Sequence, residues 1–89
     1  MMEKWNGKKL ADYMISKHGT TNPMVLANIY GFNVTVCSTD LFQASYSIDD
    51  YGNKEILINE SVSPIQIPFY IGQQLALFLL RNPSEIERA

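Results

Sequence analysis

The chain has 89 residues, a length that suits one small domain with a modest hydrophobic core. Hydrophobic residues make up 46% of it and charged residues 18%, which excludes a disordered or fibrous protein. The net charge is only -2 and the seven lysines and arginines are scattered along the chain, so direct binding to nucleic acid is disfavoured.

The cysteine content and the apolar stretches indicate the compartment. Cys37 is the single cysteine and cannot form an intramolecular disulfide, and the opening MMEKWNGKKL lacks the apolar run of a secretory signal. The longest apolar stretch, around residues 67–80, is interrupted by Pro68 and Gly72 and is shorter than the roughly 20 residues that span a bilayer. We therefore expect a cytoplasmic protein without a membrane segment.

Two short helices are predicted first, over about residues 8–18 and 23–30. Apolar residues follow helical spacing in the first, and Gly19 stands where that helix would end. In the second, Asn22 is a suitable N-cap and Pro23 occupies the first helical position.

The middle of the chain has the alternation of half-buried strands. Apolar and polar residues alternate over about residues 32–37 and 41–48, and a further strand is predicted over 54–59. Turn-forming residues fill positions 49–53 between the last two strands. These two strands should therefore form a β-hairpin.

The last predicted element is an apolar helix over about residues 64–81. Ser63 and Gln66 fit a capping box at its start. A later start near Ile67 is the alternative, because Pro68 would then lie in the first turn, where a proline is tolerated.

These elements predict one α+β domain over residues 1–89. We expect a small, three-stranded, mostly antiparallel sheet that is covered on one face by helices, with the last helix filling the core.

The order of helix, helix, strand, hairpin and apolar helix resembles the front half of an ImmA/IrrE-type metallopeptidase domain. Members of this family are zinc peptidases, often encoded beside a helix-turn-helix repressor. The similar stretches are NPMVLANIYGFNVTV (22–36), YGNKEILINE (51–60) and PFYIGQQLALFLL (68–80), which cover most of residues 20–80. The resemblance implies a zincin-like half-domain.

Carried over position by position, the resemblance places the family's zinc motif on three residues that cannot perform its chemistry. The first zinc histidine falls on Gln73, the catalytic glutamate on Gln74 and the second zinc histidine on Leu77. The motif H-E-x-x-H requires two histidines on one helix face and a glutamate that polarises the metal-bound water. The chain contains one histidine, His18, so a two-histidine site is impossible. We therefore expect a degenerate, catalytically inactive member that has no metal site and no cofactor.

The resemblance also implies an acidic third ligand on a following helix, for which Glu85 or Glu87 is available. We expect the remainder of that helix to be missing, so that the fold is truncated and part of its apolar surface is uncovered. Whether residue 89 is the natural C-terminus stays open.

The stretch IGQQLALFLL also has a simpler interpretation as an ordinary core helix. In that case Ile71, Leu75 and Leu79 face the sheet, while Gln73 and Gln74 lie in solvent. The two interpretations are compatible.

The predicted hairpin carries a second candidate surface. Asp49, Asp50 and Tyr51 lie at its tip and Glu55 follows in the next strand, so the hairpin could present an acidic, aromatic surface to a basic partner. A solvated turn is the alternative interpretation.

Three functional hypotheses follow, and none involves chemistry. The first is a pseudopeptidase-like protein that binds a protein partner, which by the resemblance would be a helix-turn-helix regulator of a phage or mobile element. The second is a small acidic inhibitor, of the kind phages encode, that blocks a host defence or nucleic-acid enzyme. The third is a structural subunit of a larger assembly, including a homo-oligomer.

Overall fold

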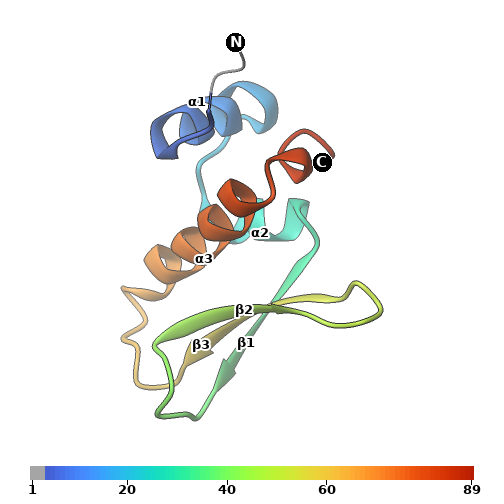
Figure 1. The fold of residues 1–89 in the computed structure, drawn as a ribbon. Helices are drawn as coiled ribbons and strands as arrows, with labels where there is room; N and C mark the ends of the chain where they lie inside the picture. The colour runs from blue at the N-terminus through green and yellow to red at the C-terminus, as the bar shows by residue number, and fades with distance from the viewer. Residues whose placement is uncertain (1–3) are drawn as a thin grey trace.

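A computed structural model describes residues 4–89, which form three α-helices, three β-strands and one short 3₁₀ helix (Figure 1). In chain order these are α1 (Gly7–His18), α2 (Pro23–Ile29), β1 (Phe32–Cys37), β2 (Ala44–Ile48), β3 (Lys54–Asn59), α3 (Ile67–Arg81) and η1 (Pro83–Glu85). The fold is α+β with a mixed three-stranded sheet. Residues 1–3 of the predicted domain lie outside the described residues.

The first two helices are bounded by their capping residues. The side chain of Asn6 accepts a hydrogen bond from the Lys9 N–H at 2.9 Å, and Gly19 ends α1 in the left-handed conformation with φ of 72°. The side chain of Asn22 caps α2 by accepting from two backbone N–H groups. Local sequence is therefore enough to define both helices.

Helix α3 begins at Ile67, three residues later than the predicted start at residue 64. A helix starting at 64 would need an N–H at Pro68 to bond the carbonyl of residue 64, and proline has none. Residues 63–66 instead form a turn, in which the Gln66 N–H donates to the Ser63 carbonyl at 2.9 Å. The capping box is not formed, because the Gln66 side chain makes no capping bond.

The sheet has the strand order β1-β3-β2. Strands β2 and β3 pair antiparallel from Ile48 opposite Lys54, which is the predicted hairpin. Strand β1 pairs parallel with β3, so the expectation of a mostly antiparallel sheet was wrong. The physical reason is that β3 takes the central position, where Ile56 and Ile58 are fully buried.

Strand β2 begins at Ala44 and not at residue 41. The preceding loop is held by the buried side chain of Asn59, whose Nδ2 donates to the carbonyls of Thr39 at 2.6 Å and Phe42 at 2.9 Å. These two carbonyls therefore bond the Asn59 side chain and do not take part in the hydrogen bonds between β2 and β3.

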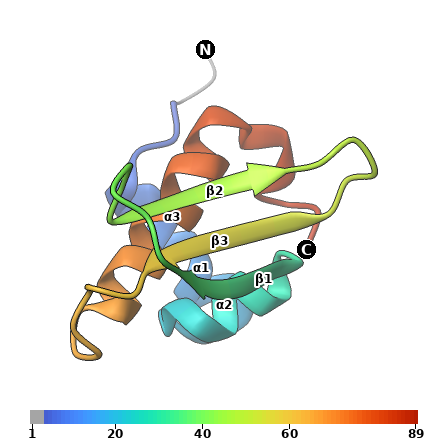
Figure 2. The ribbon, with the colours of Figure 1, turned by 90° about the horizontal axis from the view of Figure 1, so that it is seen from below.

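Helices α2 and α3 pack on one face of the sheet, and α1 lies beyond them (Figure 1). The view in Figure 2 shows that no helix of residues 4–89 covers the other face. Six large side chains are completely buried between these layers: Phe32, Ile56, Ile58, Ile71, Leu79 and Ile86. Within the same residues, no helix is long and apolar enough to cross a membrane.

The segment after α3 folds back onto the core. Ile86 is fully buried, and its carbonyl accepts a hydrogen bond of 2.6 Å from the hydroxyl of Tyr30. Ile86 therefore packs into the core beyond the end of α3.

Candidate functional site

The three positions that correspond to the zinc motif do not share one environment. Gln73 is exposed and Leu77 is 37% exposed, whereas Gln74 is only 8% exposed. Residues four apart lie on the same helix face, and the next residue is rotated by about 100°. Gln73 and Leu77 therefore share the outer side of α3. The expectation that both glutamines lie in solvent was wrong for Gln74, which turns toward the core.

Phe69 extends the surface formed by Gln73 and Leu77. It lies four residues before Gln73 and is 65% exposed, and its ring packs edge-on against Tyr70 with the ring centroids 5.4 Å apart. We call Phe69, Gln73 and Leu77 the outer face of α3. By helical geometry this face is roughly opposite to Ile71, Leu75 and Leu79. All three are buried, although Leu75 and Leu79 line a pocket between the helices.

The chemistry of the outer face is that of a contact surface. Its two apolar side chains flank one amide, that of Gln73, which can donate and accept hydrogen bonds. No group of three or more His, Cys, Asp or Glu residues within 4–89 is arranged to hold a metal ion. The face therefore offers apolar area and one amide, but no base, nucleophile or ligand set.

The single histidine and the candidate third ligand lie elsewhere. His18 ends α1, with its Nε2 3.3 Å from the hydroxyl of Tyr30. Glu85 lies in η1, beyond the end of α3, and pairs with Arg88 at 3.2 Å. The fold thus does not bring the one histidine or the candidate third ligand to the outer face.

At the hairpin, the structure assigns Asp49 a local role in the turn. Its carboxylate accepts from the Asn53 side chain at 2.8 Å, the Asn53 N–H at 2.9 Å and the Tyr51 N–H at 2.8 Å. These bonds, led by that from the Asn53 side chain, hold the pKa of Asp49 below its usual value. Asp49 therefore stays charged while it closes the turn.

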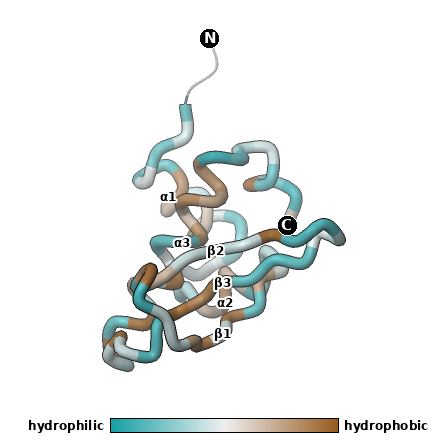
Figure 3. Tube along the Cα trace, turned by 60° about the horizontal axis from the view of Figure 1, so that its bottom comes forward, coloured by the Kyte–Doolittle hydropathy of each residue, from teal (hydrophilic) through white to brown (hydrophobic). Residues whose placement is uncertain are grey.

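The remaining hairpin residues divide into two groups. Asp50 and Tyr51 are exposed at the tip, Tyr51 to 91%, and this turn is hydrophilic in Figure 3. Glu55 points away from the helices, where its carboxylate accepts from the hydroxyl of Thr35 at 2.7 Å. The structure thus brings together Asp49, Asp50 and Tyr51, and Glu55 belongs to the open sheet face.

The sequence analysis missed Phe69 as a site residue. The signal was present, because Phe69, Gln73 and Leu77 are each four residues apart.

Comparisons of the chain with family models, curated proteins and solved structures find no match. The site is accordingly interpreted from its own residues.

Proposed function

We propose that this chain is a non-catalytic protein-binding module, of the zincin-like half-domain type, whose partner contacts the outer face of α3. The supporting observation is that α3 exposes Phe69 and Leu77 on the side opposite its buried face. A helix that is apolar on both sides is normally covered on both. Aromatic and large apolar side chains also serve as anchors at protein interfaces.

The non-catalytic part of the proposal is supported by the side chains at the motif positions. Gln73 and Leu77 share one helix face, which is the geometry of a two-histidine metal site, yet neither side chain can replace imidazole. Gln74 is a neutral amide and cannot act as a general base.

The resemblance to ImmA/IrrE-type peptidases suggests which partner to look for. A helix-turn-helix regulator of a phage or mobile element, bound in the cytoplasm, would be sequestered or switched without cleavage. Contact through Phe69 and Leu77 is mainly apolar, so such a complex should persist at moderate ionic strength.

Affinity purification of the tagged chain from its own host, with mass spectrometry of the co-purifying proteins, tests this proposal. The chain is compared with a Phe69→Ser/Leu77→Ser variant and with Ile15→Ser, a control on α1 where the side chain is 56% exposed. We expect the double variant to lose a stoichiometric partner by about tenfold or more, a change worth about 1.4 kcal/mol. Equal recovery by all three proteins would refute the outer face as the binding site.

Zinc content tests the absence of a zinc-dependent active site separately. We expect the purified protein to hold no stoichiometric zinc by elemental analysis, even after exposure to the metal. A Gln73→His/Leu77→His variant is the positive control, because it places two imidazoles four residues apart on one face. Stoichiometric zinc in the unaltered protein would contradict the proposal.

A second candidate, an acidic inhibitor of a host enzyme, is favoured by one observation, the 91% exposure of Tyr51 at the hairpin tip. Asp50→Asn and Tyr51→Ser are the informative variants, because Asp49 is needed for the turn itself. Binding through the tip should weaken in these variants and as ionic strength rises.

A chain recovered only with copies of itself would instead support the structural-subunit hypothesis.

A further inference from the structure

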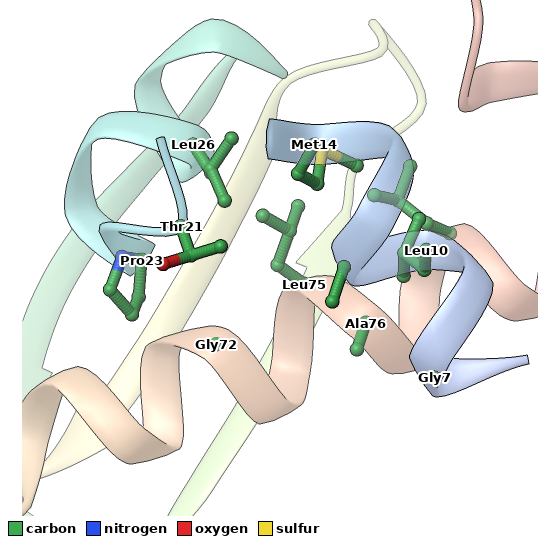
Figure 4. Close-up of a pocket in the computed structure, with 11 residues that line it drawn as sticks. Gly7, Leu10, Met14, Thr21, Pro23, Leu26, Gly72, Leu75 and Ala76 are labelled. Atoms are coloured by element: carbon green, nitrogen blue, oxygen red, sulfur yellow. The ribbon is translucent and has the colours of Figure 1, made fainter. Parts of the chain in front are cut away.

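A pocket of about 180 Å³ lies between α1, α2 and α3 (Figure 4). Its floor consists of buried apolar side chains: Leu10, Met14, Leu26, Leu75 and Leu79. Gly7, Ala11 and Thr21 line it as well and are exposed, so the pocket reaches the surface. Thr21 carries the single hydroxyl in an otherwise apolar lining.

Short side chains on facing helices keep this space open. Gly7 and Ala11 lie four residues apart on α1, and Gly72 and Ala76 have the same spacing on α3, so each pair occupies one helix face. Figure 4 shows Gly72 and Ala76 on α3 beneath α1 and the start of α2.

The backbone does not require glycine at these positions. Gly72 lies inside α3 without a positive φ, and an added Cβ would be 3.5 Å from Pro23, which is an ordinary contact. A Cβ at Gly7 would meet nothing within 4 Å. Glycine inside a helix costs about 1 kcal/mol relative to alanine. The structural consequence of these short side chains is therefore an unfilled pocket, which lies beside the contact that Pro23 makes at Gly72.

The lining determines which ligands are suitable. No ionisable side chain lines the pocket, so a charged group inside it would be desolvated without a partner. An enclosed cavity of roughly 150 Å³ with an apolar lining is known to bind benzene. The present pocket has a comparable volume and lining, and it is open to the surface. We propose that this pocket binds an uncharged, apolar small molecule of about six to eight heavy atoms.

This proposal is independent of the partner-binding face. Phe69, Gln73 and Leu77 do not line the pocket, although they lie on the same helix as Gly72 and Ala76. A ligand in the pocket and a protein on the outer face of α3 would therefore contact different side chains, and variants can separate them.

Titration of the full chain with benzene, followed by ¹⁵N–¹H correlation spectra, tests the proposal. We expect saturable shifts of the amide signals of Gly7, Gly72 and Ala76. The Ala76→Leu variant fills the pocket from α3, and Ala11→Leu fills it from α1. Each should weaken benzene binding by about tenfold or more.

Gln73→Ala is the matched control, because it alters α3 on the outer face and should bind benzene like the unaltered chain. A dispersed spectrum verifies folding of each variant, and Ala11→Leu decides the test if Ala76→Leu does not fold. The absence of saturable shifts in the unaltered chain, or undiminished binding by the folded pocket variants, would overturn the proposal. Neither result depends on whether Phe69 and Leu77 bind a protein partner.

Discussion

Tyr30 connects three parts of the chain through one hydroxyl group. The group donates to the Ile86 carbonyl at 2.6 Å and lies 3.7 Å from the sulfur of Met14 and 3.3 Å from Nε2 of His18. It thereby links the last turn of α2 with α1 and with the C-terminal segment. A buried carbonyl that loses its donor is costly, so this single atom has consequences for stability.

Replacing this hydroxyl tests its contribution. We expect Tyr30→Phe to lower the free energy of unfolding by about 1–3 kcal/mol, because the buried Ile86 carbonyl loses its partner. Urea denaturation measures the change. Tyr46→Phe is the control, since the Tyr46 hydroxyl only accepts an exposed bond from Arg81 at 3.2 Å, and it should change stability by less than about 0.5 kcal/mol. Equal effects of the two substitutions would contradict this account.

The same residue gives a dependence on pH. Burial, and to a smaller extent the nearby Tyr13, raises the pKa of Tyr30 to about 12. Tyrosine in an unfolded chain titrates near 10, so between these values the unfolded state binds fewer protons than the folded state. Ionisation of Tyr30 should therefore leave stability unchanged below about pH 10, and stability should fall as pH rises further, by up to roughly 1.4 kcal/mol per unit.

Urea titrations at about pH 9 and about pH 11 measure this effect, and the Tyr30→Phe variant is the reference. The two proteins differ only at this position, so the difference in stability between them reports on Tyr30. The gap in stability between the two proteins should narrow on going to the higher pH. A constant or growing gap would show that burial does not favour the neutral form of Tyr30.

At the scale of elements, α3 presents three surfaces with one apolar sequence. Phe78 packs against Phe32 and Tyr46 of the sheet, Gly72 and Ala76 line the pocket, and Phe69 remains exposed on the outer face. The helical period of the apolar residues and their preference for helix account for the buried face of α3. They do not explain a glycine in the helix interior.

Gly72 is therefore a useful position for substitution. We expect Gly72→Ala to raise the free energy of unfolding by about 0.5–1 kcal/mol, because alanine is the better helix former and its Cβ meets Pro23 at an ordinary 3.5 Å. Thermal and urea denaturation measure the gain. Gly31→Ala should have the opposite sign, since Gly31 has φ of 81° and a side chain there is strained. A loss of stability in Gly72→Ala would show that the helices pack more tightly at this point than the contacts indicate.

At the scale of the whole molecule, the C-terminal segment completes the core. Ile86 is fully buried although it lies outside the main helices and strands. We expect Ile86→Ala to lower the free energy of unfolding by about 2–5 kcal/mol through lost burial and the cavity that it leaves. Glu87→Ala, at an exposed position, is the control and should be nearly neutral. Urea denaturation of both variants decides whether the segment is part of the cooperative fold.

Signals that act over a few residues were sufficient for much of this fold. The caps at Asn22 and Gly19, the hairpin turn and the α+β class follow from local sequence, because each depends on backbone conformations or bonds within about one turn. The burial of Ile71, Leu75 and Leu79 likewise follows from helical period. By itself, the sequence also determined that the motif positions carry no imidazole and no carboxylate.

Only the tertiary structure decided features that join distant residues. The central place of β3 and its parallel pairing with β1 depend on which strand pairs along both of its edges, a comparison that no local pattern contains. The burial of Gln74, the closure of the core by Ile86 and the pocket beneath α1 depend on how helices pack against one another. Contacts of this kind join residues far apart in the chain, so their energies are set by the assembled fold and not by neighbouring residues.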